Sequence, residues 1–124
     1  MSESNVELAR RGYEAVLRGD LEALSELLDP EVRWHAGDPT DRYACHNRQE
    51  ALGFMRQNWI RRGGPPGEPV EFAGAADKVV VIMRRTGDDG QPERVANLTS
   101  FRDGKVVEMV HYANPDDARA AAGV

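Results

Sequence analysis

The first third of the chain carries two amphipathic helical patterns in direct succession. Apolar side chains recur at helical spacing over residues 4–18 and again over residues 21–28. Gly19 and Asp20 separate the two patterns, and these residue types suit the end of one helix and the start of the next. The second pattern stops before Pro30, which disfavours helical geometry in the residue preceding it. The sequence therefore predicts two helices joined without a linker.

Three further elements follow from local patterns. "VRWH" at 32–35 predicts a short strand, and a third helix is predicted near residues 48–61 after a polar loop. The tail "NPDDARAAAGV" predicts a short last helix, with Asn114 as its cap and Pro115 in its first turn. The apolar face of the third helix comprises Ala51, Leu52, Met55 and Trp59.

The segment after Val70 has the pattern of an antiparallel meander. Apolar and β-branched runs are separated by turn signals near Asp77, at residues 88–90 and at residues 102–105. "VVVIM" at 79–83 is apolar at both odd and even positions, so both faces of that strand should be covered. If helices cover only one face of so small a sheet, a second subunit covers the other. We therefore expect a homodimer through the outer sheet face, burying some of Val80, Ile82, Leu98 and Val110.

Length and charge limit the classes of function. The 124 residues favour a single domain spanning 1–124. A formal net charge of −5, with no Lys or Arg run, argues against a nucleic-acid or anionic-membrane surface. The single cysteine, Cys45, excludes an internal disulfide and a thiolate metal cluster. The beginning of the chain has no apolar run of signal-peptide length, so we expect a cytoplasmic protein.

The order of elements resembles the nuclear transport factor 2-like superfamily, in its SnoaL-like, ketosteroid isomerase-like branch. The residues that carry the resemblance are "YEAVLRGDLEALSELLDPEVRW" (13–34), "RQEALGFM" (48–55) and "FRDGKVVEMVHY" (101–112). It implies an α+β fold, in which a cone-shaped curved antiparallel sheet wraps around three N-terminal helices and one apolar pocket. The family includes isomerases, polyketide cyclases, dehydratases and epoxide hydrolases, so the resemblance implies no single reaction.

The isomerase positions of that family carry different residues in this chain. The strand acid that donates a hydrogen bond to an oxyanion corresponds to Asn97. The general base corresponds to Ala36, with His35 beside it. Tyr13 lies one residue closer to "GD" than the family tyrosine, about 100° around a helix, which should turn it from the pocket. Steroid-type isomerisation is therefore not expected.

His111 is the strongest candidate for chemistry. It interrupts the apolar strand "VVEMVHY" and corresponds to the last-strand aspartate of the epoxide hydrolases. A core imidazole with a hydrogen-bond partner is the alternative to a pocket acid/base. Burial beside Val107 and Met109 should lower its pKa, since Glu108 should face the other way. The spacing of the three histidines and Cys45 fits no standard zinc pattern, so no metal is expected.

The turn at residues 102–104 decides whether Asn97 and His111 share a face. A two-residue loop, Asp103-Gly104, would place Ala96 opposite His111 and turn Asn97 away. A three-residue loop with Gly104 left-handed reverses that parity and places Asn97 beside His111. We expect the three-residue loop.

These residues together predict a small-molecule enzyme of SnoaL-like type, an isomerase, cyclase or hydrolase, that needs no cofactor. The expected catalytic residues are His111, which would move the proton, and Asn97, which would hold a carbonyl or hydroxyl of the ligand. The ligand is expected to be a largely apolar ring compound or a polyketide-like molecule. The alternative is a non-catalytic dimer that binds a small ligand in the same pocket. The expected substrate-binding residues are Tyr13, Trp34, Trp59, Met83, Thr99, Phe101 and Met109.

Overall fold

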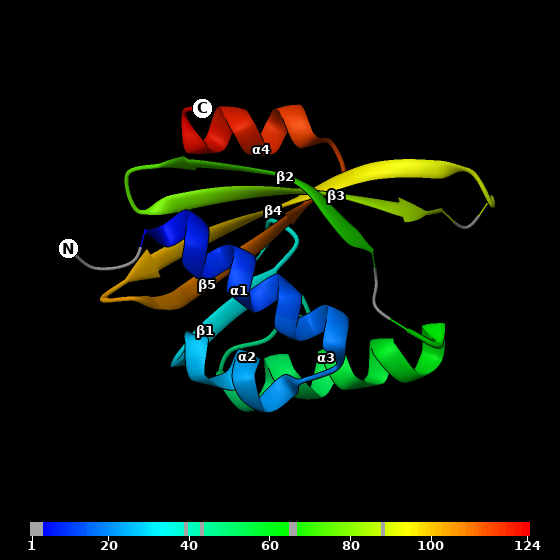
Figure 1. Ribbon diagram of the computed structural model, residues 1–124, viewed down its shortest axis with the longest axis horizontal. Helices are drawn as coiled ribbons and strands as arrows, with labels where there is room; N and C mark the ends of the chain where they lie inside the picture. Colours follow the sequence, from blue (N-terminus) through cyan, green and yellow to red (C-terminus); the bar gives the residue numbers. More distant parts are fainter. Residues whose placement is uncertain (1–3, 39, 43, 65–66, 88) are drawn as a thin grey trace.

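The computed structural model describes residues 4–38, 40–42, 44–64, 67–87 and 89–124. A five-stranded sheet lies between three helices on one face and one helix on the other (Figure 1). Within the described residues, no helix is long and apolar enough to cross a membrane. The elements in chain order are α1 (Asn5–Arg18), α2 (Leu21–Leu27), β1 (Leu28–His35), α3 (Arg48–Arg62), β2 (Glu68–Ala75), β3 (Lys78–Thr86), β4 (Pro92–Arg102), β5 (Lys105–Tyr112) and α4 (Pro115–Ala122).

Side-chain caps set the helix boundaries that the sequence predicts. The Ser4 side chain accepts a hydrogen bond from the Glu7 amide at the start of α1, and Asn47 does the same for Glu50 at the start of α3. Gly19 ends α1 with a φ of 72°, a left-handed conformation that glycine adopts without a Cβ penalty. Asn114 caps α4, in which Pro115 takes the first turn.

The sheet is mixed, with the order β1-β5-β4-β3-β2. Strands β2 to β5 form the expected antiparallel meander. Strand β1 instead pairs in parallel with β5, so the expectation of a wholly antiparallel sheet is wrong for this edge. The parallel pair arises because α3 and three strands intervene before the chain returns beside β1.

The hairpin between β4 and β5 differs from the expected three-residue loop. Arg102 pairs with Lys105, so the loop has two residues, Asp103 and Gly104, with φ of 52° and 78°. A two-residue hairpin loop of this type requires a positive φ at both of its residues. The positive φ expected at Gly104 is confirmed.

A bulge in β5 restores the parity that the longer loop was expected to provide. Phe101 pairs with Val106, whereas Ser100 pairs with Glu108, which leaves Val107 as an extra residue. Asn97 is consequently the cross-strand partner of His111. The shared face of these two residues is confirmed, but by a bulge and not by the loop.

The outer face of the sheet is covered by α4, which lies alone on that side (Figure 1). Ala118 of α4 is fully buried against a cluster that includes Val80, Ile82, Ala96 and Leu98. The inference that helices cover only one face is therefore wrong. A homodimer stays a prediction, but burial of these residues no longer requires one.

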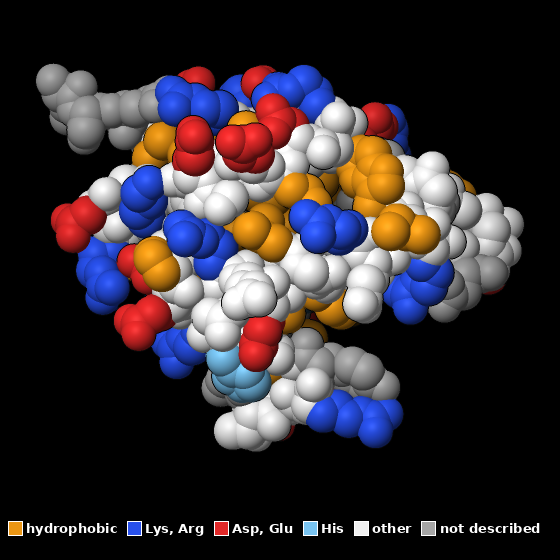
Figure 2. Space-filling view, turned by 90° about the horizontal axis from the view of Figure 1, so that it is seen from below, with side chains coloured by type: hydrophobic (Ala, Val, Ile, Leu, Met, Phe, Trp, Pro, Cys, Tyr) orange, Lys and Arg blue, Asp and Glu red, His pale blue; other side chains and the backbone are white. Residues whose placement is uncertain are grey.

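Figure 2 shows the molecule from the side on which α2 and α3 lie, where hydrophobic side chains are interspersed with charged side chains of both signs. The large apolar residues that stay exposed on the first three helices are Leu17, Phe54 and Ile60.

Candidate functional site

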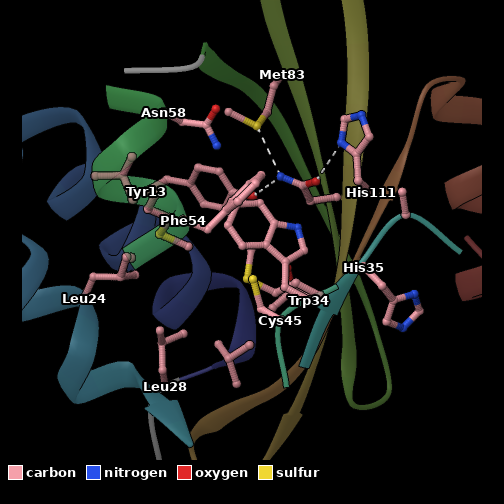
Figure 3. Close-up of a pocket in the computed structure, with 18 of the residues that line it drawn as sticks. Tyr13, Leu24, Leu28, Trp34, His35, Cys45, Phe54, Asn58, Met83 and His111 are labelled. Atoms are coloured by element: carbon pink, nitrogen blue, oxygen red, sulfur yellow. Dashed lines mark hydrogen bonds between the residues drawn. The ribbon is translucent and has the colours of Figure 1, made fainter. Parts of the chain in front are cut away.

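A cavity of about 460 Å³ lies between the first three helices and the inner face of the sheet (Figure 3). Its wall is mainly apolar, with α1, α2 and α3 supplying one side, the strands β1, β3, β4 and β5 supplying the other, and the loop after β1 also contributing. The charged side chains that border it are exposed or half-exposed, which places them toward solvent. These are Asp38, Asp41, Arg61 and Arg85.

Trp34 anchors the loop that follows β1 to the wall of the cavity. The backbones of Trp34 and Cys45 exchange two hydrogen bonds, of 2.9 and 2.8 Å, which return the loop to the end of β1. The Trp34 ring packs edge-on against Phe54 of α3 with ring centroids 5.2 Å apart. These contacts join β1, the loop and α3 around the cavity.

A chain of polar side chains crosses the cavity wall from α1 to β5. Asn97 donates from Nδ2 to the Tyr13 hydroxyl oxygen over 2.7 Å and to Met83 Sδ over 3.4 Å. Asn97 Oδ1 lies 3.2 Å from His111 Nδ1. Figure 3 shows Tyr13, Met83 and His111 around this amide, each joined to it by a dashed line.

Burial changes the proton affinity of both ends of this chain. It raises the pKa of Tyr13 to about 12, against a smaller lowering by the Asn97 hydrogen bond. Burial also lowers the pKa of His111, helped by the nearby Arg85 guanidinium and opposed by Glu93. The lowered pKa agrees with the expectation from sequence, although Glu93 is a nearby carboxylate that sequence reasoning missed. At neutral pH, Tyr13 is therefore protonated and His111 is mainly neutral.

Tyr13 shows that the rotation argument drawn from its sequence position is wrong. It lines the cavity and its hydroxyl contacts Asn97. Its ring packs edge-on against Phe72 of β2 with centroids 6.0 Å apart, which helps to hold it against the sheet. The packing of α1 on the sheet sets the rotation of this helix. A shift of one residue relative to "GD" therefore does not turn the Tyr13 side chain away from the cavity.

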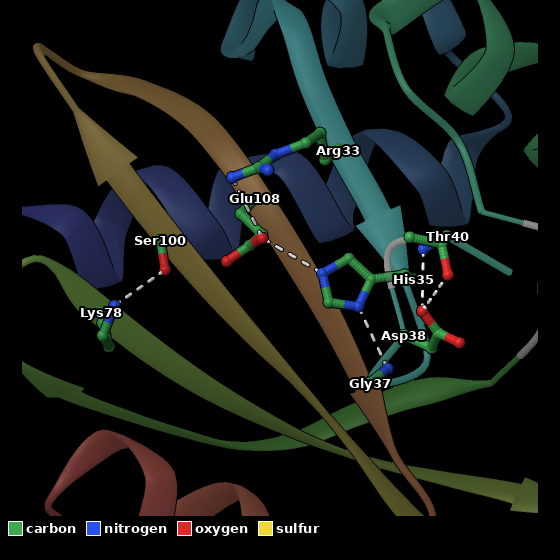
Figure 4. Close-up of polar contacts among 8 residues, drawn as sticks. All are labelled: Arg33, His35, Gly37, Asp38, Thr40, Lys78, Ser100 and Glu108. Carbon is green, nitrogen blue, oxygen red and sulfur yellow. Dashed lines mark hydrogen bonds and ion pairs between the residues drawn. The ribbon is translucent and has the colours of Figure 1, made fainter.

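His35 faces the opposite side of the sheet from Trp34 (Figure 3). Its Nε2 lies 3.1 Å from Glu108 on the outer face, and its Nδ1 accepts from the Gly37 amide over 3.1 Å (Figure 4). Since Nδ1 accepts, Nε2 carries the hydrogen and donates it to Glu108 when the ring is neutral. Both ring nitrogens are thus used in structural contacts, although His35 is among the residues that line the cavity, next to Ala36.

The structure brings most of the expected binding residues to the cavity. Tyr13, Trp34, Trp59, Met83, Thr99 and Met109 line it together with Asn97 and His111. Phe101 is buried in the core but lies outside the cavity lining, which differs from the expectation. The Thr99 hydroxyl is buried with no hydrogen-bond partner among the described residues.

Sequence reasoning missed several lining residues that a periodicity argument could have found. Arg85 follows Val81 and Met83 at every second position of β3, and Asn58 and Arg61 lie near Trp59 on α3. Cys45 also lines the cavity, where burial and the nearby Glu50 raise the pKa of its thiol. Such a thiol stays protonated at neutral pH and is a poor nucleophile.

The described residues hold no group of three or more His, Cys, Asp or Glu that could bind a metal ion. What the arrangement does provide is a neutral tyrosine, a neutral histidine and an amide between them, set in an apolar wall. Groups of these types can orient an organic ligand through hydrogen bonds and transfer a proton.

The model of the SnoaL-like domain family matches residues 9–109 of the chain. No curated protein sequence matches it. Solved structures of similar fold include an NTF2-like protein of unknown function from Burkholderia pseudomallei, with 23% identity, a TM-score of 0.70 and coverage of 98% of this chain and 100% of that chain. A putative polyketide cyclase from Sinorhizobium meliloti has 18% identity and a TM-score of 0.72, covering 85% and 93%. TerC, co-crystallized with polyporic acid, has 21% identity and a TM-score of 0.71, covering 97% and 98%. At these identities, the structural likeness shows the fold alone.

Proposed function

The chain belongs to the SnoaL-like domain family, and from this premise we propose that it is a small-molecule enzyme, an isomerase, cyclase or hydrolase. It acts by cofactor-free general acid/base chemistry in the apolar cavity, with His111 as the group that moves the proton. The ligand is a largely apolar ring compound. A neighbour described as a putative polyketide cyclase and another co-crystallized with polyporic acid are in keeping with a small organic ligand.

The observation that carries the proposal is the Tyr13–Asn97–His111 chain in the wall of the cavity. The cavity volume of about 460 Å³ falls within the range of roughly 300–1,000 Å³ that is typical of small-molecule sites. An apolar wall with a few converging polar groups buries the ligand and fixes its orientation. Trp34, Trp59 and Met109 supply apolar wall around these groups.

His111 suits proton transfer because its pKa lies below the usual value for a histidine and the neutral ring can accept a proton at pH 7. Tyr13, with a pKa of about 12, keeps its proton through this pH range and acts as a hydrogen-bond donor. The two residues therefore have different roles: His111 changes its charge during the reaction, whereas Tyr13 stays neutral.

A non-catalytic ligand-binding protein is the second candidate, and one observation favours it. Within the cavity's polar chain of Tyr13, Asn97 and His111, His111 alone can change its charge at a pH well below 12, the approximate pKa of Tyr13. A reaction that needs both an acid and a base would have to use His111 for both steps. If His111 does not act as both acid and base, the pocket would bind a ligand and release it unchanged.

The two tryptophans of the chain, Trp34 and Trp59, both line the cavity, so tryptophan fluorescence reports directly on binding there. A panel of ring ketones, phenols and ring carboxylic acids is titrated into the wild type, and each compound that binds is assayed for turnover. His111→Gln keeps a hydrogen-bonding side chain without a titratable ring, and His46→Gln is the control at an exposed histidine in the loop before α3.

The enzyme proposal predicts that His111→Gln lowers the turnover of a bound compound by roughly 10²- to 10⁴-fold, whereas His46→Gln leaves it unchanged. Turnover that survives in folded His111→Gln refutes the role of His111 as acid/base. Compounds that bind but are never converted by the wild type support the binding protein.

A further inference from the structure

The amide of Asn97 has no hydrogen left for a ligand. Its Nδ2 carries two hydrogens, and two acceptors lie within reach, the Tyr13 hydroxyl oxygen at 2.7 Å and Met83 Sδ at 3.4 Å. The residue is also only 7% exposed. This differs from the role expected from sequence, in which Asn97 holds a carbonyl or hydroxyl of the ligand.

The orientation of this amide determines which nitrogen of His111 carries the hydrogen. Because Nδ2 points at Tyr13 and Met83, the atom that faces His111 Nδ1 at 3.2 Å is the carbonyl oxygen Oδ1. A carbonyl oxygen only accepts, so the neutral ring must carry its hydrogen on Nδ1. The lone pair is then on Nε2, for which no hydrogen-bond partner is found among the described residues.

The same amide determines the direction of the Tyr13 hydroxyl. The hydroxyl oxygen accepts from Asn97, so the hydroxyl hydrogen must point elsewhere. No protein acceptor for this hydrogen is found in the part of the chain that the structure describes, and Tyr13 lines the cavity. Tyr13 therefore has a hydrogen to donate, and His111 has a lone pair with which to accept.

We propose that Asn97 is a positioning residue that acts through its two neighbours. By donating to Tyr13 and accepting from His111, it keeps the tyrosine as a donor and His111 Nε2 as the basic atom. The register supports this role, since Asn97 and His111 are direct cross-strand partners and Met83 lies on the strand that flanks β4 on its other side. A leucine at this position can perform neither task, and an aspartate that is ionised beside His111 has no hydrogen to give to Tyr13.

The inference rests on the proposed function only for its consequence in catalysis. The matching substrate carries an acceptor oxygen for the Tyr13 hydroxyl and, elsewhere in the same molecule, an acidic hydrogen for His111 Nε2. The tautomer of His111 is a property of the free protein and can be measured without any substrate.

The test compares the wild type with Asn97→Leu and Asn97→Asp, and uses Ser100→Ala as the control on the outer face of the same strand, where Ser100 binds Lys78 (Figure 4). Long-range ¹H–¹⁵N correlation spectra of the histidine rings, assigned with His111→Gln, report which nitrogen is protonated. Spectra are recorded well above pH 6.5, where the His111 ring is neutral.

The wild type and Ser100→Ala are expected to show His111 protonated on Nδ1. Asn97→Leu removes the acceptor, so the hydrogen is expected to redistribute to Nε2. Asn97→Asp keeps an acceptor and adds a negative charge, so Nδ1 stays protonated and the pKa of His111 rises. The charged groups otherwise near His111 are Arg85 and Glu93, and they are unchanged in all variants.

With a substrate from the fluorescence panel, Asn97→Leu is expected to lower kcat by at least about tenfold, as part of the range that a general base contributes. Asn97→Asp is expected to move the acidic limb of the kcat/KM profile to higher pH. A wild-type His111 protonated on Nε2 overturns the inference, and so does an unchanged tautomer in folded Asn97→Leu. If the spectra are as expected but no compound is converted, the positioning role stands and the proposed enzyme function fails.

Discussion

Replacing Tyr13 by Phe tests the hydrogen bond on which the site depends. The change keeps the ring, and hence its edge-on contact with Phe72, but removes the oxygen that accepts from Asn97 over 2.7 Å. One N–H of the Asn97 amide is then left without an acceptor, in a residue that is only 7% exposed. A buried donor left unsatisfied costs roughly 1–3 kcal/mol.

The expected loss lies at the lower end of that range. The second amide hydrogen keeps its contact with Met83 Sδ, and removal of the tyrosine hydroxyl also removes a polar atom from a buried place. We expect the free energy of unfolding to fall by about 1–2 kcal/mol. With an unfolding entropy of about 2.1 cal/mol/K per residue, a chain of 124 residues should lose roughly 4–8 °C in Tm.

Urea unfolding followed by far-ultraviolet circular dichroism measures the change in the free energy of unfolding. An unchanged m-value shows that the variant and the wild type expose the same amount of surface on unfolding. Tyr112→Phe is the matched control, since Tyr112 is half-buried against the outer cluster and makes no hydrogen bond through its side chain among the described residues. That variant is expected to stay within about 0.5 kcal/mol of the wild type. If Tyr13→Phe is no less stable than Tyr112→Phe, the bond between Tyr13 and Asn97 does not exist in solution.

Three further predictions concern pH and packing. In alkaline titration followed by tyrosine absorbance, one tyrosine should ionise near pH 12, and Tyr13→Phe should remove that step; a wild type without it contradicts the burial of Tyr13. Because the pKa of His111 is lowered in the folded state, its contribution to the free energy of unfolding is complete above pH 6.5 and is lost as the pH falls from 6.5 through the folded pKa. His111→Gln should remove this component from urea titrations repeated at several pH values, and identical profiles would count against it. Gly74→Ala should lower stability by about 1–3 kcal/mol, because its Cβ would lie 2.7 Å from Val6 Cγ2, whereas Gly53→Ala in α3 meets no atom within 4 Å and should be neutral or stabilising by thermal unfolding.

Local signals in the sequence were sufficient for the helices, but not for the length of the turn between β4 and β5. Gly19 with Asp20, and Asn114 with Pro115, satisfy or replace backbone groups within a few residues of themselves, so their effect does not depend on the rest of the fold. The left-handed Gly104 was predictable for the same reason. Likewise, His111 could be identified as a candidate because it interrupts the otherwise apolar strand β5, where a buried imidazole needs a hydrogen-bond partner.

Which residues meet across space was decided by the tertiary structure alone. The extra residue Val107 reverses the parity of β5, and nothing in the turn sequence distinguishes that bulge from a longer loop. Tyr13 reaches Asn97 because the packing of α1 on the sheet sets its rotation. The covering of the outer face by α4 likewise depends on the direction of the chain after β5, which only the assembled fold determines. Contacts of this kind depend on elements far apart in the chain, whose relative placement comes from packing the whole core and not from any local preference.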